Sequence, residues 1–460
     1  MLDGQNSHAE ALPTLFLPVE IKHREFKAKV LLGTIAARAG FQVYLGSKAA
    51  VDAMVFRRRQ RSGIYFYKGG KPLDFLTKLL GKVEHFVVLD EEMGPAVQNL
   101  RTAYTMRIYR GTEHLVGRLF VVGRRHKDVL SEVRPELADK VEVTGWPRID
   151  LWSRRYQHQY GDEVAALRHK YGRFLLFSSN FGVISKDVLD REVQHIRSVT
   201  ATPGDAAIYE ASMKGALEDF RAFIELAKRM DADPDFPKVV IRPHPSEDIA
   251  VWRQHLGRLK KIQLVYQGET GPWLQASKGL LHRGCTTAIQ AHLGQVPPIF
   301  IVAGQHKPDS ESLPFRLSHP GRDYDALRQL CIDALEGELA PKANDDFADE
   351  IFLPKEGAAE RIVHSLQALQ VQSDLPVRDA LPLRVIRIGL GVARHWLGSL
   401  VRTKGRQGIR VRDRKLPGGL HGSEVKMVAR KLGVDGGVSF CECDFNLVKI
   451  RPVQDASGGR

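Results

Sequence analysis

Short apolar runs alternate along the chain with longer segments whose apolar residues recur at helical spacing. Leu12–Val19 is the first apolar run, Arg24–Ala39 follows with apolar residues near one helical face, and Phe41–Gly46 is apolar again. Gly40 separates the helical segment from the second run. Strand, helix and strand in this order predict a βαβ unit and hence a parallel sheet.

The alternation continues to residue 150, is interrupted by a charged segment over residues 151–170 that is predicted to be helical, and then starts again. The other strands expected in the first half are Ile64–Tyr67, Val83–Leu89, Leu119–Val122 and Val141–Thr144, with a helix at Arg125–Glu132. The strands expected in the second half are Phe174–Ser178, Val239–Arg242, Ile262–Val265, Gly279–His282 and Ile299–Val302, with helices at Gly215–Met230 and Thr287–Gly294. We therefore expect an α/β protein with two Rossmann-like domains, residues 12–150 and 172–370, that face a cleft and bind ligands at the carboxyl ends of their strands.

The chain beyond residue 375 has a different, basic character. From Arg384 to Lys415 it holds ten basic residues and one acid, Asp413. On a helix, the apolar residues of this segment share one face: Val385, Ile388, Val392, Trp396 and Leu400. Residues 375–460 are therefore predicted to be a basic amphipathic tail whose 384–415 segment lies on an anionic membrane surface, where each Lys or Arg contributes about 1 kcal/mol. A helix packed across the two domains with a solvated basic face is the alternative.

Composition narrows the class of protein and its partners. The 460 residues include 68 Lys and Arg against 54 Asp and Glu, a formal net charge of +14, which favours a polyanionic partner such as nucleic acid, an anionic membrane or a phosphorylated substrate. The 43% hydrophobic and 27% charged residues exclude wholesale disorder and a multi-span membrane protein. The sequence holds four cysteines and neither a secretory signal nor an apolar run long enough to span a membrane. We expect a reducing, cytoplasmic location.

The strongest chemical motif is VVIRPHPSE, residues 239–247. An apolar strand runs into a turn in which two prolines flank His244, so the imidazole is held at the carboxyl end of a strand. Arg242 beside it favours an anionic ligand such as a phosphate, and Ser246 lies in the same turn. His244 can donate a hydrogen bond or a proton to a leaving phosphate. A structural turn with an incidental histidine is the alternative.

A second motif, residues 280–291, reads LLHRGCTTAIQA. A strand ends at His282, and a turn with Gly284 leads to a helix that starts near Thr286 or Thr287. The threonine hydroxyls are natural N-caps, and the first-turn amides favour a phosphate. Gly284 permits close approach of the backbone to a ligand. His282 is either a second imidazole of the site or a core histidine with satisfied hydrogen bonds; plain capping without a ligand is the alternative for the motif.

Three acids, Asp90, Glu91 and Glu92, follow an apolar strand of the first half, with Gly94 close behind. Carboxylates at the carboxyl end of a strand point toward the expected cleft, and their crowding raises the pKa of at least one of them. A raised pKa suits a general base that acts on a sugar hydroxyl. A solvated acidic turn that caps the next helix is the alternative.

Two further loops contain charged residues that are candidates for substrate binding. In TGWPRID, Arg148 either binds a phosphate or is a structural partner of Asp150, and the structural role is slightly favoured. Immediately after the first strand, Glu20 and Arg24 lie where the first strand–helix loop meets the cleft, where they either contact a substrate or form a charged helix start. The sequence contains no GxGxxG after the first strand, no Walker motif, no HExxH or paired-cysteine zinc pattern and no GxSxG.

The motifs LDEEMG, TGWPRID, VIRPHPSE and RGCTTAIQA, in this order, resemble those of the bacterial surface carbohydrate biosynthesis proteins. This family consists of glycosyltransferases with two Rossmann-like domains, the GT-B architecture. The resemblance extends from VEIKHREFKAKVLL near the start to the basic tail. Related patterns occur in sialyltransferases, polysialyltransferases and Kdo transferases that use CMP-activated sugars, and in teichoic-acid polymerases that use CDP-glycerol or CDP-ribitol.

The resemblance implies roles for individual residues. The general base is Glu91 or Glu92; Met93 separates these acids from Gly94, a departure from the family pattern that leaves open which carboxylate acts. His244 is the acid or a phosphate ligand, and Thr286 and Thr287 bind phosphate. The implied enzyme is a glycosyltransferase of surface polysaccharide biosynthesis. Its donor is a nucleotide-linked sugar, in the first place a CMP-sugar, and it is expected to need neither a metal nor a cofactor.

Two alternatives stay open: an enzyme of the CDP-alditol glycerophosphotransferase type, and a non-enzymatic scaffold of glycan assembly. The expected partners are a nucleotide-sugar donor, a glycan or lipid-linked acceptor and an anionic membrane surface. A nucleic-acid partner is not expected, because no base-stacking aromatic residues interleave with the basic run.

Overall fold

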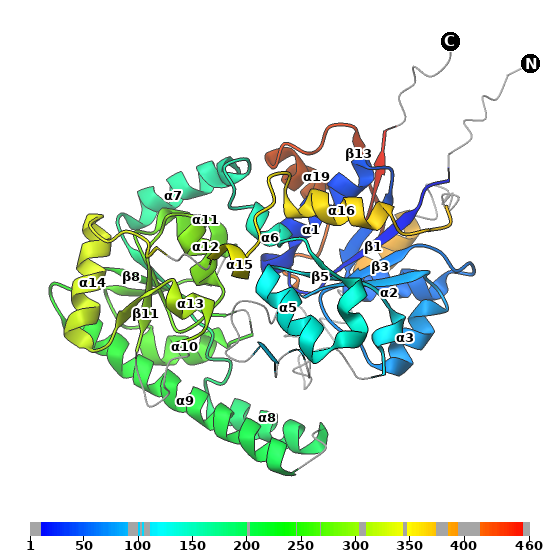
Figure 1. Ribbon diagram of the computed structural model, residues 1–460. Helices are drawn as coiled ribbons and strands as arrows, with labels where there is room; N and C mark the ends of the chain where they lie inside the picture. Colours follow the sequence, from blue (N-terminus) through cyan, green and yellow to red (C-terminus); the bar gives the residue numbers. More distant parts are fainter. Residues whose placement is uncertain are drawn as a thin grey trace, which may run out of the picture. The chain divides into compact units, whose positions relative to one another are not determined.

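The computed structural model describes residues 11–90, 100–101, 104, 111–199, 203–244, 246–266, 268–302, 310–343, 347–373, 385–393 and 415–453. The chain forms two compact units. Unit 1 combines the N-terminal part, up to Gln159, with the residues from Ala348 onward, and Tyr160–Phe347 form the body of unit 2. Each unit contains a largely or wholly parallel sheet with helices between its strands, so the predicted α/β class with two Rossmann-like regions is confirmed (Figure 1).

Unit 1 contains an eight-stranded sheet in the order β13-β14-β2-β1-β3-β4-β5-β6. Its parallel strands are β1 (Thr14–Val19), β2 (Gln42–Ser47), β3 (Ile64–Tyr67), β4 (His85–Leu89), β5 (Val116–Val121) and β6 (Val141–Val143). Every residue of β1 and β2 is buried, as expected for central strands of a parallel sheet that is covered on both faces.

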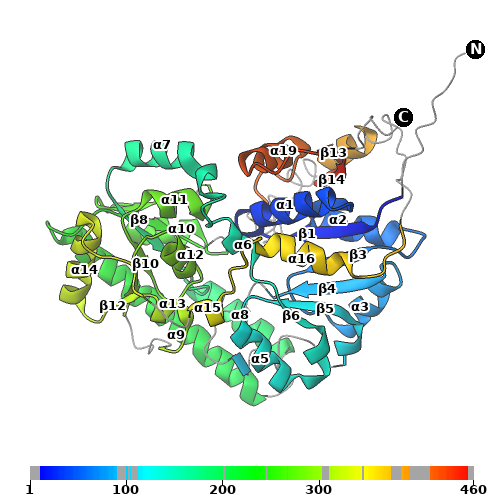
Figure 2. The same cartoon turned by 45° about the horizontal axis from the view of Figure 1, so that its top comes forward.

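Helices cover both faces of this sheet. The side chains of α2 (Lys48–Arg57), α3 (Leu73–Leu80) and α5 (Arg124–Val133) pack in one core with aromatic residues of the strands, including Phe16, Tyr65 and Phe86. α1 (Lys22–Arg38) lies beside α16 (Ala358–Gln367), a helix more than three hundred residues away in sequence (Figures 1 and 2). Shorter elements are η1 (Glu113–Leu115), η2 (Pro135–Lys140) and α6 (Pro147–Asp150).

The C-terminal part of the chain completes unit 1. α19 (Gly422–Lys431) packs on α1 (Figure 2). β14 (Leu447–Pro452) pairs antiparallel with β2 and with the edge strand β13 (Val438–Asp444). Lys22, the first residue of α1, connects α1 to this part of the chain. Its ammonium donates to the Gly419 carbonyl at 2.6 Å and pairs with Glu424 at 2.8 Å.

These observations change the predicted domain limits. The sequence placed residues up to 370 in the second domain and treated 375–460 as a separate tail, whereas α16 and residues 415–453 belong to unit 1. The reason is burial: Leu447, Val448 and Ile450 are enclosed beside β2 although they lie in a charged sequence. Residues 385–393 are helical, and the rest of the predicted basic segment up to residue 414 lies outside the described residues.

Unit 2 contains a six-stranded parallel sheet in the order β12-β11-β10-β7-β8-β9. Its strands are β7 (Leu175–Ser178), β8 (Val239–Arg242), β9 (Ile262–Leu264), β10 (Leu280–His282), β11 (Pro298–Ile301) and β12 (His319–Gly321). Its helices are α7 (Gly161–Tyr171), α8 (Lys186–Val199), α9 (Pro203–Ala232), α10 (Ile249–Leu256), α11 (Thr270–Ala276), α12 (Thr287–Leu293), α13 (Leu313–Arg316) and α14 (Tyr324–Glu336). The 3-10 helix η3 (Gln157–Tyr160) and the short helix α15 (Phe347–Glu350) lie where the chain enters and leaves this unit.

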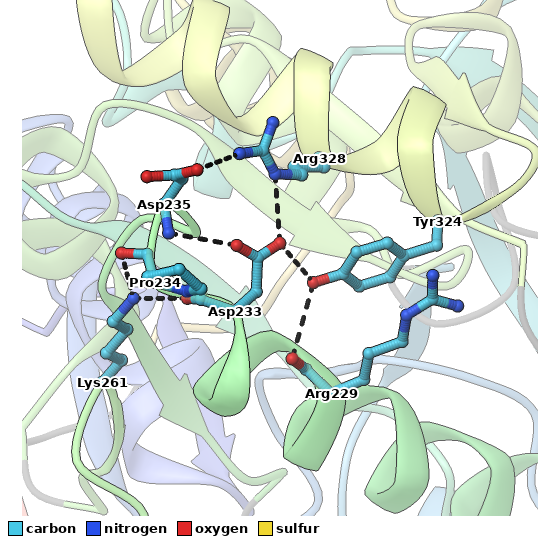
Figure 3. A network of polar contacts seen from close by, with 7 residues as sticks. All are labelled: Arg229, Asp233, Pro234, Asp235, Lys261, Tyr324 and Arg328. Atoms are coloured by element: carbon cyan, nitrogen blue, oxygen red, sulfur yellow. Dashed lines mark hydrogen bonds and ion pairs between the residues drawn. The ribbon is translucent and has the colours of Figure 1, made fainter.

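A polar network links α9 to α14 near the point where the chain enters β8 (Figure 3). The Tyr324 hydroxyl donates to Asp233 at 2.8 Å, and Arg328 pairs with the same carboxylate at 3.0 Å and with Asp235 at 2.8 Å. The Arg229 guanidinium stacks on the Tyr324 ring, 3.6 Å from its centroid. The network therefore joins two helices at the amino end of the sheet, away from the strand ends that carry the predicted motifs.

In the described part of the chain, no helix is long and apolar enough to cross a membrane.

Candidate functional site

The strand order of unit 2 places its predicted motifs side by side. The chain starts at β7, adds β8 and β9 on one side, and then returns to build β10, β11 and β12 on the other. Ligands of such sheets bind outside the carboxyl ends of the strands, where the strand order reverses. We call the residues at this place the unit 2 edge: Ser178, Ser179, Arg242, His244, Thr286 and Thr287.

Hydrogen bonds connect three strand ends within the unit 2 edge. The hydroxyl oxygens of Ser178 and Thr287 are 3.4 Å apart, which joins the end of β7 to the start of α12. The next residue, Ser179, accepts a hydrogen bond from the backbone N–H of His244 at 3.0 Å, which joins the end of β7 to the turn after β8. The two strongest sequence motifs, around His244 and around Thr287, thus meet at the same stretch of β7.

The His244 ring has a defined acceptor atom. Its Nδ1 lies 2.7 Å from the Ser246 hydroxyl and accepts from the Ser246 backbone N–H at 3.2 Å. Because Nδ1 accepts a backbone hydrogen bond, the neutral ring carries its proton on Nε2. Nε2 is therefore the ring atom that can donate to a ligand, and Ser246 acts by orienting the ring.

Arg242 is directed to the other side of β8. Its guanidinium donates to the Gly268 carbonyl at 2.7 Å and lies 5.4 Å from the centre of the Trp273 ring. Burial lowers the pKa of Arg242 to about 10, and the charge of Glu269 opposes that shift. The side chain stays positively charged at neutral pH and contributes its charge from the side of α11.

Glu247 is a site residue that the sequence interpretation did not single out. Its buried carboxylate accepts hydrogen bonds from the Ser179 hydroxyl, from the Gly182 N–H at 3.2 Å and from the His244 N–H at 3.3 Å. Trp252 Nε1 donates to it as well, at 3.1 Å. Burial raises the pKa of Glu247, against these four hydrogen bonds. An acid directly after the His-Pro turn was the available signal, but two of its donors, Ser179 and Gly182, come from the distant loop after β7.

The turn before α12 differs in detail from the prediction. Thr286 occupies the N-cap position, but its side chain makes no capping hydrogen bond, so the expected hydroxyl cap is wrong for this residue. Gly284 has a φ of 95°, a backbone conformation that glycine adopts more readily than other residues. Its N–H donates to His282 Nδ1 at 3.0 Å.

His282 is a core histidine. The residue is fully buried, its Nε2 lies 2.7 Å from the Ser318 hydroxyl and its ring packs edge-on against Phe300. Burial lowers its pKa to about 3, so the ring is neutral. Of the two interpretations of His282, the structure supports the core histidine, and the assignment as a substrate-binding residue is wrong.

The remaining predicted site residues lie in unit 1. Glu20 follows β1 and accepts from the Tyr67 hydroxyl, and Lys68 pairs with it at 3.1 Å. Burial opposes ionisation of Glu20, but the Tyr67 hydrogen bond and the Lys68 charge outweigh it and lower the pKa of this carboxyl. Arg24 is half-buried in the first turn of α1. Glu91 and Glu92 lie outside the described residues, and Asp90 before them is buried.

Arg148 and Asp150 have different contacts. The Arg148 guanidinium lies 5.5 Å from the centre of the Trp146 ring. Asp150 instead accepts hydrogen bonds from the N–H groups of Ala358 and Ala359, both at 3.0 Å, and so holds the start of α16. Burial raises the pKa of Asp150 to about 6. Asp150 is therefore a structural residue, and the phosphate-binding role of Arg148 stays a prediction.

Among the residues described, no group of three His, Cys, Asp or Glu side chains is arranged to hold a metal ion.

No protein-family model matches the sequence, and the search of curated proteins gives no match. Among solved structures, the chain is similar to UDP-GlcNAc 2-epimerase from Neisseria meningitidis bound to UDP-GlcNAc, at 12% identity, with 77% of this chain and 99% of that chain covered and a TM-score of 0.46.

Two further solved structures are similar at the same level. UDP-GlcNAc 2-epimerase from Methanocaldococcus jannaschii, in complex with UDP-GlcNAc and UDP, has 12% identity, coverage of 77% and 99%, and a TM-score of 0.45. The wall teichoic acid polymerase TagF has 8% identity, coverage of 78% and 90%, and a TM-score of 0.45. Similarities of this size do not assign an activity to this chain.

Proposed function

We propose that this protein is a glycosyltransferase that moves a sugar from a nucleotide donor, a CMP-sugar in the first place, to a hydroxyl of a surface glycan or of a lipid-linked acceptor. One observation carries the proposal. Ser178 is hydrogen-bonded to Thr287, and its chain neighbour Ser179 to His244, at the point where the strand order of unit 2 reverses. This is the place where Rossmann-like sheets bind nucleotides.

The groups of the unit 2 edge suit a phosphate ligand. Ser178 and Thr287 offer hydroxyl donors, and His244 offers its Nε2–H. Arg242 adds a half-buried positive charge on the neighbouring side of β8. Together they can stabilise a leaving phosphate electrostatically without a metal ion.

In the proposed reaction, the acceptor hydroxyl oxygen forms a bond to the anomeric carbon while the bond from that carbon to the phosphate oxygen of the donor breaks. The hydroxyl proton passes to a carboxylate, for which Glu91 or Glu92 is the candidate from the sequence. The nucleotide leaves as a phosphate whose new charge is met by His244 Nε2–H and the hydroxyls of Ser178 and Thr287. Beyond the donor and the acceptor, no redox partner or further substrate is needed.

A thermal-shift panel of CMP, CDP, UMP, UDP and GDP tests the proposal. A ligand that binds the native state stabilises it by RT ln(1 + [L]/Kd), or about 2.7 kcal/mol at one hundred times Kd. We expect CMP to stabilise the protein most. Thr287→Val keeps the shape of the side chain but removes the hydroxyl, so it should weaken nucleotide binding on the order of tenfold.

Thr77→Val is the matched control, because the Thr77 hydroxyl is exposed and bonded to the Leu73 carbonyl within α3. Equal nucleotide stabilisation of wild type and Thr287→Val would contradict the proposed site. A transfer assay then separates the activities: release of CMP from a CMP-sugar supports the glycosyltransferase, and consumption of a CDP-alditol supports the glycerophosphotransferase alternative. A folded His244→Ala variant that still complements a deletion strain would support the scaffold alternative.

The proposed partners include an anionic membrane surface, reached through residues 384–415 in a cytoplasmic protein. Support comes from the helical residues 385–393, in which Val385, Ile386, Leu390 and Val392 are 48–60% exposed although they are apolar. Apolar side chains beside a strongly basic sequence favour the interface of an anionic bilayer. Replacement of Ile386 and Leu390 by Ser should weaken binding to phosphatidylserine-containing vesicles. Unchanged vesicle binding would contradict this part of the proposal.

A further inference from the structure

The sheet of unit 1 has its own point of strand-order reversal. β1 lies between β2, which follows it in the chain, and β3, which comes next. The loops after β1, β2 and β3 therefore meet at the carboxyl end of the sheet, where ligands of such sheets bind. We call the residues at this place the unit 1 edge: Glu20, Lys48, Tyr67, Lys68 and Lys71.

The acids near this edge are already neutralised. Lys68 is buried and pairs with Glu20 at 3.1 Å and with Glu25 at 2.9 Å. The Tyr67 hydroxyl donates to Glu20, and Lys48 pairs with Asp52 on α2. The carboxylates that face the edge thus have partners other than Lys71.

Lys71 has aromatic contacts instead. Its ammonium lies 4.1 Å from the centre of the Tyr67 ring and 5.9 Å from that of Phe75, and in the described part of the chain no carboxylate lies within ion-pair distance of it. The Lys48 ammonium approaches the same two rings, at 5.9 and 5.1 Å. Burial and the charge of Lys48 lower the pKa of Lys71, although Glu20 and Asp52 oppose that shift. The two ammonium groups repel each other, and Asp52 balances the Lys48 charge only in part, so an anion beside Lys71 would offset the positive charge that remains.

The start of α1 has an unusual charge for its position. The N-terminus of a helix carries a partial positive charge and favours acids. Here the first turn holds Lys22, His23 and Arg24 beside a single acid, Glu25, whose carboxylate accepts from the Glu20 backbone N–H at 3.0 Å. Lys22 is paired with Glu424, but the basic residues together give this end of the sheet a positive potential from a second element.

We propose that Lys71 and Lys48 bind an oxyanion, a phosphate or a carboxylate, that the acceptor carries, with the Tyr67 ring beneath it. The assignment of this anion to the acceptor rests on the proposed function; the anion site itself does not. The acceptor class is therefore a sugar with an acidic group close to the hydroxyl that receives the new residue.

Three small sugars that contain no nucleotide test the proposal. Glucose 6-phosphate, glucuronic acid and glucose are titrated into the full-length protein, and Kd is measured by ligand-observed NMR. We expect binding of one or both anionic sugars and none of glucose, and the stronger of the two identifies phosphate or carboxylate as the preferred group. Lys71→Met should raise the Kd of that sugar about tenfold, the effect of removing one charge-assisted contact. Lys71→Arg should keep most of the affinity.

Two controls make the outcome specific. Lys78→Met removes the same charge from an exposed position on α3 and should bind like wild type. Thr287→Val tests whether the anion binds at the unit 2 edge instead. The proposal is overturned if neither anionic sugar binds, if glucose binds equally well, if folded Lys71→Met binds like wild type, or if Thr287→Val alone loses binding. Nucleotide stabilisation of the wild type is measured separately, so failure here leaves the proposed function standing.

Discussion

The two sheets present different chemistry at their carboxyl ends. The unit 1 edge consists mainly of long charged side chains, and Lys68 alone neutralises two acids there. The unit 2 edge consists mainly of short hydroxyl side chains and one imidazole, with Arg242 as its one long charged side chain. Backbone N–H groups converge there on Ser179 and on the buried Glu247. Both places are points of strand-order reversal in the same kind of fold.

The difference matches the two ligands proposed for the two sheets. At the unit 2 edge, hydrogen-bond donors are held by the backbone in a fixed arrangement. Such an arrangement suits a phosphate group, because its geometry does not vary between ligands. At the unit 1 edge, charge is balanced between flexible side chains, which suits a more variable, charged partner. Substitutions that remove charge should therefore affect unit 1 more, and substitutions that remove acceptors should affect unit 2 more.

Lys68→Met should have the largest effect. It leaves the acids at positions 20 and 25 without their buried counter-charge, and breaking such a pair costs on the order of 3–5 kcal/mol. Urea unfolding combined with hydrogen exchange of unit 1 measures the loss. Lys140→Met is the control, because Lys140 donates to the Glu113 backbone carbonyl and not to a carboxylate. A loss no larger than that of the control would mean that the charge balance at the unit 1 edge does not contribute to stability.

Glu247→Gln should have the next largest effect, and it should fall on unit 2. The amide keeps one acceptor oxygen but turns an NH₂ group toward buried donors, which costs about 1–3 kcal/mol. Nucleotide binding should weaken as well, because the backbone of His244 loses its fixed position. Urea unfolding and the CMP thermal shift measure both effects. Glu225→Gln, at an exposed position of α9, is the control, and an equally small effect of both substitutions would contradict the role of Glu247.

The His282 pKa predicts a pH dependence of unit 2. An unfolded histidine titrates near 6.5, whereas the buried ring titrates at about 3, so the unfolded state binds more protons between these values. This contribution to stability is therefore complete well above pH 6.5 and falls as the pH decreases, with a loss of about 2 kcal/mol by pH 5. Unfolding curves of wild type and His282→Gln over this range measure it. Parallel pH profiles of the two proteins would exclude His282 as the source.

Tyr324→Phe should have the smallest effect. It removes the hydroxyl that donates to Asp233 in the network at the amino end of the unit 2 sheet, while the ring on which Arg229 stacks is kept. Because the network lies away from the strand ends, the melting temperature should fall slightly and the shift produced by CMP should stay the same. A changed nucleotide affinity would mean that the two ends of the sheet are coupled.

Periodicity predicted the parallel core well. β3 and β8 were expected at their observed bounds, because apolar runs that are buried on both faces are visible in the sequence. β12, β13 and β14 were not expected. β12 is only three residues long. β13 and β14 lie beyond a strongly basic segment, in a part of the sequence that was predicted as a basic tail. Their burial depends on β2, which the local pattern does not include.

The sequence by itself determined the α/β class and the chemical groups at the strand ends, because strand burial and turn chemistry are local properties. Tertiary structure alone decided how those groups are used. His282 became a core residue because Ser318 and Phe300 enclose it. Glu247 became a site residue because donors from the loop after β7 and from α10 converge on it. Hydrogen bonds between distant segments depend on the strand order, and the strand order is a property of the whole chain.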